Sequence, residues 1–472
     1  MSRLLFVKPR KDYQENVVTP PLGPLTLAAY VRKHRPSWDV KVLDMRMVAP
    51  GDGPLERELE TFRPDVIGIS ALTVEADVGS DAARSFRGLG YRGPILMGGP
   101  HPSADPEGTA RLPGIDYAIV GEGEETLVEL LDRLEAGQEP KDVAGIAYAK
   151  DDVVLQTPVR PYMEELDGLP FPAWDLVDVH AYSKRYKFSK MIAQAPYAVI
   201  FSSRACPYRC TYCHHNFGKK FHARSPENVL AEVDYLVREH GIREIEFWDD
   251  IFNLDRVRCA RILEMIAARR YDLKLAFPNG LRGDLMTDEL IDRFADAGTY
   301  YIAYAVESGS ERVQKVIKKN VNLPKLQGVI EKTASRGIFT HGFFILGFPT
   351  ESAEEMRSTV DWALGSKLHT AGFFVANPYP GTELTEMALE MGLDAKPDGN
   401  RYDYLGVGYN LSATPTAFLR ELKNLAYRKF YLNPARLARI ARDFPNKRAL
   451  TALLPRYASF FLRRVASPGF AA

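Results

Sequence analysis

Apolar and polar positions along the chain form two long series in which strand patterns alternate with helix patterns. The first series contains five short apolar runs, at 4–7, 40–43, 66–70, 95–97 and 117–120. The run at 66–70 (VIGIS) is continuously apolar up to its last residue, which is typical of a parallel strand buried on both faces. Five strand–helix units in this order predict an open, doubly wound α/β sheet. Ligands of such sheets bind beyond the carboxyl ends of the strands.

The second series predicts a different α/β architecture. Its six strand-like runs lie at 198–202, 244–248, 274–277, 301–306, 339–346 and 372–376. Helix patterns lie between them, and Ser225 stands as an N-cap where one of these patterns begins. Six β/α units are too few for a closed eight-stranded barrel. We therefore expect an open, partial (β/α)6 barrel whose site lies at the carboxyl ends of its strands.

These patterns predict four segments. Irregular, proline-rich sequence separates the two series, and the residues after 400 have helical patterns. The predicted organisation is a doubly wound domain at 1–145, a linker at 146–190, a partial barrel at 191–400 and a small helical, basic region at 401–472.

Composition places the chain among ordinary globular proteins. Of its 472 residues 46% are apolar and 26% are charged, which excludes global disorder. No apolar run approaches 18 residues, so we expect no membrane-spanning helix. The first residues have too short an apolar core for a signal peptide, and we expect a cytoplasmic protein.

Charge is balanced overall but not along the chain. The 61 Lys and Arg residues equal the 61 Asp and Glu residues, yet segment 420–464 holds twelve of the former and two of the latter. This basic segment predicts contact with an anionic substrate, with a membrane surface or with the acidic remainder of the protein. No nucleic-acid motif accompanies it, so nucleic acid is not an expected partner.

Three of the four cysteines lie within eight residues. Cys206, Cys210 and Cys213 form the pattern C-x-x-x-C-x-x-C directly after the first strand of the second series. Three thiolates hold three irons of a [4Fe–4S] cluster and leave the fourth iron without a protein ligand. The alternative is a zinc site completed by His214 or His215. Cys259, in a helical pattern, is expected to be an inert, packed thiol, so the chain has cysteines for one cluster only.

The cysteine pattern, with an aromatic residue before its third cysteine, resembles that of the radical S-adenosylmethionine (SAM) superfamily. The resemblance implies a [4Fe–4S] cluster on Cys206, Cys210 and Cys213, whose open iron chelates SAM. Polar residues follow the later strands in the order of that family. The implied SAM-binding residues are Tyr212, Asp249, Asp250, Arg282, Glu307, Gly347 and Asn377.

The first domain resembles a cobalamin-binding domain. Ser70-Ala71-Leu72 matches the S-x-L motif of that family, Gly98-Gly99 matches its glycine pair, and Gly121-Glu122-Gly123-Glu124 is similar to a further common segment. The implied cobalamin-binding residues are Asp44, Ser70, Leu72, Gly98, Gly99, Gly121 and Glu122. The segment after the first strand has no histidine, so we expect cobalamin to bind with its base displaced and no histidine on cobalt; His101 is the nearest alternative.

Together these resemblances imply a cobalamin-dependent radical SAM enzyme. The function expected first is C-methylation of an unactivated carbon of a small molecule, by a 5′-deoxyadenosyl radical and methylcobalamin. A cyclase or oxidoreductase with the same cofactors, as in anaerobic magnesium-protoporphyrin ester cyclases, is the second possibility. A non-catalytic, zinc-stabilised cobalamin carrier or sensor is the third. SAM reduction also implies anaerobic chemistry and an external electron donor such as flavodoxin or ferredoxin. No catalytic side chain beyond the cofactors is assigned.

Overall fold

The computed structural model describes residues 2–11, 18–49, 51–185, 187, 189, 191–396, 398, 401–402, 406–447 and 450. The chain divides into two compact units. The first comprises Met1–Lys190, Arg204–Cys206 and His214–Arg224, and the second comprises Met191–Ser203, Pro207–Cys213 and Ser225–Ala472. By this division Cys206 is counted with the first unit, and Cys210 and Cys213 are counted with the second.

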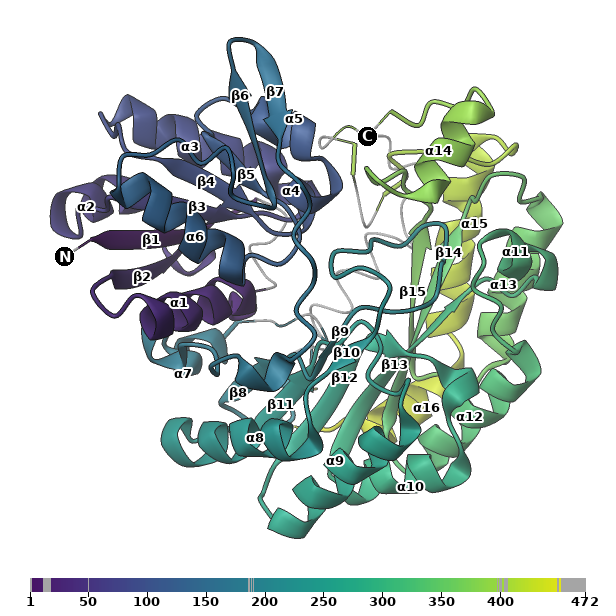
Figure 1. The fold of residues 1–472 in the computed structure, drawn as a ribbon. Helices are drawn as coiled ribbons and strands as arrows, with labels where there is room; N and C mark the ends of the chain where they lie inside the picture. Colours follow the sequence, from purple (N-terminus) through teal and green to yellow (C-terminus); the bar gives the residue numbers. More distant parts are fainter. Residues whose placement is uncertain are drawn as a thin grey trace. The chain divides into compact units, whose positions relative to one another are not determined.

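The first unit is built on a seven-stranded sheet of order β2-β1-β3-β4-β5-β6-β7 (Figure 1). Its strands are β1 (Arg3–Lys8), β2 (Asp39–Asp44), β3 (Val66–Ser70), β4 (Ile95–Gly98), β5 (Tyr117–Ile119), β6 (Ile146–Lys150) and β7 (Val153–Gln156). Its helices are α1 (Leu22–His34), α2 (Pro54–Thr61), α3 (Ala76–Gly88), α4 (Pro100–Ala104), α5 (Pro106–Ala110), α6 (Glu124–Glu135) and α7 (Val179–Tyr182).

The first five strands of this sheet are parallel, which confirms the doubly wound architecture. Strands β1 and β3 carry alternate apolar side chains, such as Leu5 and Ile67, into a core that also contains Phe86 of α3. The sheet is larger than the sequence pattern predicts, because β6 and β7 extend it as an antiparallel hairpin. The expected domain end at residue 145 falls before these two strands.

The second unit is built on a six-stranded, all-parallel sheet of order β15-β14-β13-β12-β11-β8, as expected for an open (β/α)6 barrel. Its strands are β8 (Tyr197–Ile200), β11 (Glu244–Phe247), β12 (Lys274–Leu281), β13 (Thr299–Glu307), β14 (Phe339–Leu346) and β15 (Thr370–Val375). Its helices are α8 (Pro226–His240), α9 (Arg256–Arg269), α10 (Asp288–Asp296), α11 (Glu311–Val316), α12 (Leu323–Ser335), α13 (Ala353–Gly365), α14 (Glu383–Glu390), α15 (Thr416–Tyr431) and α16 (Pro434–Asp443).

Short polar side chains start several of these helices. Ser225 and Ser352 accept a hydrogen bond from the backbone of the first turn of α8 and α13. Behind the strands, an aromatic cluster joins the sheet to its helices, with Phe247 stacked on Phe277 and Phe294 of α10 edge-on to Phe277. Such pairs add to the apolar burial that holds β/α layers together.

Strand β15 is an edge of this open sheet, and α15 covers it (Figure 1). The hydroxyl of Tyr431 lies 3.0 Å from the amide nitrogen and 2.9 Å from the carbonyl oxygen of Ala371. The hydroxyl of Tyr427, one helical turn earlier, binds Phe373 in the same way. Two side chains thus occupy hydrogen-bonding groups that an exposed edge strand would offer to another chain.

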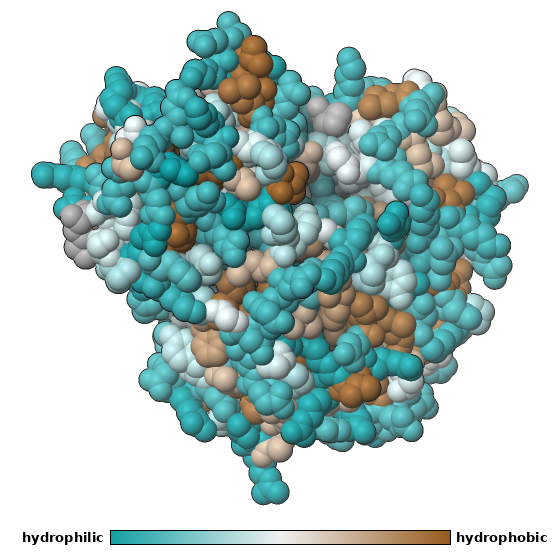
Figure 2. Space-filling view, in the orientation of Figure 1, coloured by the Kyte–Doolittle hydropathy of each residue, from teal (hydrophilic) through white to brown (hydrophobic). Residues whose placement is uncertain are grey.

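Surface hydropathy varies over short distances (Figure 2). On the face seen there, hydrophilic residues predominate and apolar residues form separate patches. One apolar patch lies over the β6–β7 hairpin, where Val153 is 58% exposed and Leu155 is 41% exposed. Within the described part of the chain, no helix is long and apolar enough to cross a membrane.

Candidate functional site

The cysteine pattern lies in the segment between two short paired strands, β9 (Ser203–Arg204) and β10 (His222–Ala223). Its second half is held by the backbone of the second unit. The amide of Thr211 donates to the carbonyl of Ile317, and the carbonyl of Thr211 accepts from the amide of Leu384 (2.8 Å). No disulfide joins the described cysteines, and Cys210 is buried whereas Cys213 is exposed.

The zinc alternative requires several ligands around one ion. Within the described residues, no group of three or more His, Cys, Asp or Glu side chains is arranged to hold a single metal ion. A [4Fe–4S] cluster makes a different demand, because each thiolate binds its own iron. A donor set of three cysteines fits such a cluster, which then keeps one iron open.

Glu307 and Tyr212 come together in the second unit. Glu307 ends β13, is buried, and accepts a hydrogen bond from the hydroxyl of Tyr212. Lys319 lies 3.5 Å from the same carboxylate. Burial raises the pKa of Glu307, and Lys319 and Tyr212 oppose that rise. The carboxylate is thus placed beside Tyr212 of the cysteine pattern, where it can hold an ammonium or hydroxyl group of a ligand.

The backbone of Glu307 is strained. Its φ is +67°, and the pairing of β13 with β14 shifts register between Ala305 and Glu307. A non-glycine residue in the left-handed region costs about 1 kcal/mol or more and is often found at functional sites. This conformation redirects the side chain at the end of the strand.

Arg282 binds other residues of the protein. Its guanidinium lies 3.7 Å from the ring centroid of Tyr208, a residue of the cysteine pattern, and forms an ion pair with Asp284 at 2.9 Å. It also donates to the carbonyl of Lys319. Arg282 therefore stabilises the cysteine segment. Lys319 contacts Arg282 through its backbone carbonyl and Glu307 through its ammonium group.

Asp249 also has partners within the protein. Its carboxylate accepts the hydroxyl hydrogens of Ser202 and Ser203, and also the amide hydrogen of Ser202 at 3.2 Å. Burial raises the pKa of Asp249 despite these bonds. It thereby holds the turn that leads into β9, while its neighbour Asp250 is exposed.

Two further predicted residues lie at later strand ends. Asn377 follows β15, and its buried Oδ1 has no hydrogen-bond partner within the described part of the chain. An orphaned buried acceptor is costly unless a ligand completes it, so Asn377 fits a binding role. Gly347 follows β14, and its amide donates to Glu351 at 2.7 Å.

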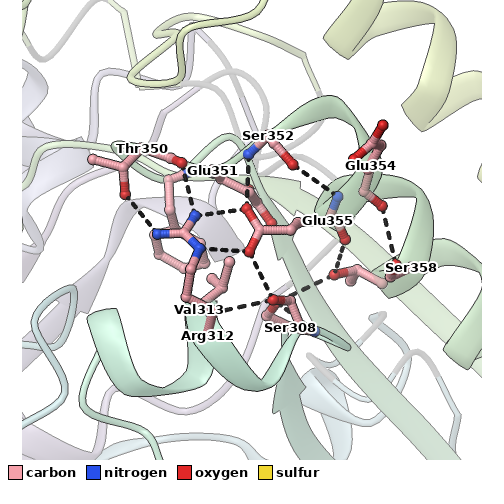
Figure 3. A network of polar contacts seen from close by, with 12 residues as sticks. Ser308, Arg312, Val313, Thr350, Glu351, Ser352, Glu354, Glu355 and Ser358 are labelled. Atoms are coloured by element: carbon pink, nitrogen blue, oxygen red, sulfur yellow. Dashed lines mark hydrogen bonds and ion pairs between the residues drawn. The ribbon is translucent and has the colours of Figure 1, made fainter.

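Glu351 belongs to a polar network that joins the ends of β13 and β14 (Figure 3). Glu355 accepts two hydrogen bonds from Arg312, at 2.7 and 2.6 Å, and one from Ser310. These bonds lower the pKa of Glu355 to about 2. Burial raises the pKa of Glu351 to about 7, although the amides of Phe348 and Gly347 oppose the rise.

The network predicts a pH dependence of stability. Glu351 holds its proton more tightly when folded, so its contribution is full below pH 4.5 and is lost as pH rises through 7, by up to about 3 kcal/mol. Glu355 has the opposite sign and loses its contribution only below pH 4.5. We expect Glu351→Gln to gain stability relative to the wild type between pH 5 and 8, measured by thermal melts. Glu355→Gln, the control, should be uniformly less stable in that window; parallel curves for Glu351→Gln and wild type would contradict the prediction.

In the first unit, the carboxyl ends of β3 and β4 form a tight polar edge. Gly99 has a φ of +106°, and a Cβ there would lie 2.9 Å from the carbonyl oxygen of Ala71, so only glycine fits. Leu72 is 39% exposed at this edge. Thr73 and His101 are each 7% exposed, and no described residue hydrogen-bonds the Thr73 hydroxyl or His101 Nδ1. Burial lowers the pKa of His101 and keeps its ring neutral.

The other residues predicted for this edge have partners of their own. Asp44 ends β2 and binds Arg46 at 2.6 Å and the hydroxyl of Tyr182 at 2.7 Å. Glu122 binds Arg204. Sequence reasoning missed these partners, and it also missed Lys319, Glu351 and Thr73. The available signal for Thr73 was its place three residues after the end of β3, whereas nothing in the local sequence pattern marks Lys319.

Two family descriptions match the chain. Residues 16–131 match the B12 binding domain, and residues 200–363 match the radical SAM superfamily. An uncharacterized methyltransferase of Pyrococcus horikoshii is 30% identical over 466 residues, which cover 97% of this chain and 99% of that protein. The chain is a B12-binding radical SAM protein. The resemblance drawn from the cysteine spacing and the glycine turns is thereby confirmed.

Other similar proteins fall in the same group. Cytidylyl-2-hydroxyethylphosphonate methyltransferase of Streptomyces wedmorensis is 30% identical over 428 residues, which are 79% of this chain and 78% of that protein. The anaerobic magnesium-protoporphyrin IX monomethyl ester cyclase of Rubrivivax gelatinosus is 23% identical over 92% of this chain and 78% of the cyclase. The radical SAM methyltransferase TsrM of Kitasatospora setae has the same fold, with a TM-score of 0.69, 20% identity, and coverage of 83% of this chain and 75% of its own.

Membership of this family makes the chain an enzyme whose cofactors are a [4Fe–4S] cluster, SAM and cobalamin. The residues present fit these groups. Three cysteines supply the cluster ligands, and Glu307 and Asn377 offer buried acceptors at strand ends of the radical SAM unit. At the carboxyl ends of β3 and β4, the exposed Leu72 lies beside the Thr73 hydroxyl and His101 Nδ1, which no described residue hydrogen-bonds. These groups suit a cofactor with polar substituents on an apolar ring, and we call this candidate site the cobalamin edge.

Thr73 gives a direct test of the cobalamin edge in this B12-binding radical SAM protein. We expect Thr73→Val to weaken cobalamin binding roughly tenfold, because one buried hydrogen bond is lost. The cobalamin-free protein should melt no lower than the wild type, since no described residue hydrogen-bonds the Thr73 hydroxyl. Thr109→Val is the matched control: its buried hydroxyl donates to the carbonyl of Asp105 at 2.7 Å, so it should lower the melting temperature and spare binding. Titration by absorbance and thermal melts measure both effects; unchanged affinity of Thr73→Val would contradict the assignment.

Proposed function

We propose that this enzyme is a cobalamin-dependent radical SAM C-methyltransferase that acts on an unactivated carbon of a small molecule. The full-length similarity to a methyltransferase carries this proposal. A second methyltransferase relative, which covers 79% of the chain, supports it. The cysteine pattern and the cobalamin edge supply the two cofactor sites that such a reaction needs.

The chain's residues have the following proposed roles. Cys206, Cys210 and Cys213 ligate the cluster. Glu307, held by Tyr212 and Lys319, binds polar groups of SAM together with Asn377. Arg282 and Asp249 hold the cysteine segment and the turn before it. When bound, the cofactors supply a 5′-deoxyadenosyl radical and a transferable methyl group.

Asp250 and Gly347 complete the proposed SAM site. Gly347 offers a backbone that can lie close to the ligand, and its own amide is satisfied by Glu351. Asp250 is exposed after β11, where a carboxylate attracts the cationic sulfonium.

The cobalamin edge is proposed to comprise Ser70, Leu72, Thr73, Gly98, Gly99 and His101. Asp44 supports it through Arg46 and Tyr182. We propose that no histidine ligates cobalt. The segment after β1 contains none, and the ring of His101 belongs to a short helix after β4.

We further propose an external electron donor of the flavodoxin or ferredoxin kind and a cytoplasmic setting, because SAM reduction needs a low potential and free thiols. Peripheral membrane contact through the basic C-terminal residues is a further proposal. The final basic stretch, 448–465, lies outside the described residues except for position 450.

The decisive experiment is product mass spectrometry. Anaerobically reconstituted enzyme is incubated with dithionite, SAM, methylcobalamin and candidate metabolites. Methyl transfer predicts a product heavier by one CH₂, together with 5′-deoxyadenosine. Loss of hydrogen or gain of oxygen would instead favour the cyclase or oxidoreductase alternative, which the relative from Rubrivivax gelatinosus supports. A protein that takes up neither iron nor sulfide would return the third possibility, a zinc-stabilised carrier.

A further inference from the structure

A buried guanidinium joins the start of the cysteine segment to the turn after β5. Arg204 lies in β9, two residues before Cys206, and donates to two different carboxylates. Its two terminal nitrogens lie 2.6 Å from Glu122 Oε1 and 2.5 Å from Glu124 Oε1. The side chains are 11%, 6% and 6% exposed, respectively. Charge-assisted bonds of this length, shielded from water, are among the strongest polar contacts in proteins.

Glu122 and Arg204 each have a further contact within the first unit. The second oxygen of Glu122 accepts the backbone amide hydrogen of Met163 at 2.6 Å. Arg204 lies over the ring of Phe217, with its guanidinium carbon 5.1 Å from the ring centroid. Burial lowers the pKa of Arg204, but the carboxylates of Glu124 and Glu122 raise it by more than burial lowers it, so the guanidinium stays cationic. Both oxygens of Glu122 are thus engaged by groups of the protein itself.

The other end of the cysteine segment rests on the same region. Gly218 has a φ of +76°, and a Cβ there would lie 2.6 Å from the ring of Tyr162. The same ring lies 3.9 Å from the position a Cβ would take on Gly121. Strands β9 and β10 pair with each other and close the base of the segment. Both ends of the cysteine segment are therefore held close to the turn that contains Gly121, Glu122 and Glu124.

We propose that this turn anchors the cysteine segment, with Arg204 as a positioning residue for the cluster and with Glu122 and Glu124 as its partners rather than as cobalamin ligands. The proposal rests on the proposed function, because it needs a cluster on Cys206, Cys210 and Cys213. One cation between two carboxylates leaves a net negative charge two residues from a cluster ligand. Negative charge near an iron–sulfur cluster lowers its reduction potential.

The test compares Glu122→Gln, Glu124→Gln and Arg204→Lys with a matched control. Glu125→Gln alters the next carboxylate of the same turn, but Glu125 is 48% exposed and pairs with Arg160 instead. Each full-length variant is reconstituted anaerobically. Iron and sulfide content, iron loss to a chelator, the midpoint potential of the cluster and the affinity for cobalamin are measured, with thermal melts to verify folding.

We expect Glu122→Gln and Glu124→Gln to take up the cluster, to lose iron several-fold faster than wild type, and to shift the potential to more positive values. Arg204→Lys should lose iron fastest, because a lysine cannot form the two-pronged contact. Glu125→Gln should match wild type, and all four should bind cobalamin with wild-type affinity.

Two results would overturn the proposal. One is a wild-type potential and wild-type iron retention in both folded Glu→Gln variants. The other is weakened cobalamin binding in Glu122→Gln, which would make Glu122 a cobalamin contact. Failure of the proposed function looks different, because wild-type protein would then take up no cluster.

Discussion

Replacing Cys210 with alanine abolishes 5′-deoxyadenosine formation and leaves cobalamin bound; this is the largest effect that we expect. Three cysteines are the minimum for a cluster with one open iron, so no other side chain compensates for the loss. Cys210 is buried, and the next residue, Thr211, is fixed by backbone hydrogen bonds to Ile317 and Leu384. The residues of the cobalamin edge belong to the first unit and are untouched by the change. Chromatography of quenched anaerobic reactions measures the nucleoside, and the absorbance spectrum measures bound cobalamin.

Cys259→Ala is the matched control for that loss. Cys259 lies in α9, is fully buried, and has a thiol pKa raised by burial, so it stays protonated. We expect this variant to form deoxyadenosine like wild type. Deoxyadenosine release by Cys210→Ala at the rate of Cys259→Ala would refute the cluster assignment.

Arg436→Ala is expected to have the largest effect on stability. Arg436 is 2% exposed in α16 and has no acidic partner among its hydrogen bonds. It donates instead to five carbonyls, those of Ala363, Leu364, Ser366, Leu368 and Phe430. Two of these belong to the last turn of α13, where helix carbonyls lack internal partners. Burial lowers the pKa of Arg436 to about 10, which leaves it charged at neutral pH.

Removal of the Arg436 guanidinium would leave these buried carbonyls without that hydrogen-bond donor. We expect the free energy of unfolding to fall by about 3 kcal/mol or more. For a unit of this size that corresponds to a melting temperature lower by roughly 6–12 °C. Arg442→Ala is the control, since Arg442 lies in the same helix but is 68% exposed and pairs with Asp443. Calorimetry should show a change of less than about 1 kcal/mol for it. Equal losses for the two variants would contradict this role for Arg436.

Strand patterns predicted most of the fold because the second sheet and the first five strands of the first sheet are parallel and largely buried. The apolar runs at 66–70 and 339–346 coincide with β3 and β14. The β6–β7 hairpin was missed because its two apolar stretches, 146–149 and 153–155, are short and most of their residues are not buried. For the basic C-terminal segment, the count of charged residues did not predict which of them face solvent. Lys423 and Arg436 are buried on backbone carbonyls, so part of the positive charge is structural and does not face a partner.

Site residues could be located from the sequence, but their partners could not. Parallel strands place Asp249, Glu307 and Glu122 at or near the carboxyl ends of strands. Which of them binds a cofactor depends on contacts between distant residues. Asp249 binds serines 46 and 47 residues away, and Glu122 binds Arg204, 82 residues away. The left-handed backbone of Glu307 likewise depends on a register shift that strand patterns do not encode.

Electron paramagnetic resonance of the anaerobically purified, reduced enzyme tests the proposed cluster and its open iron most directly. An iron with no amino-acid ligand predicts a cubane signal that changes when SAM is added. A spectrum without a cubane signal, or one that SAM leaves unaltered, would contradict a cluster with a SAM-binding open iron.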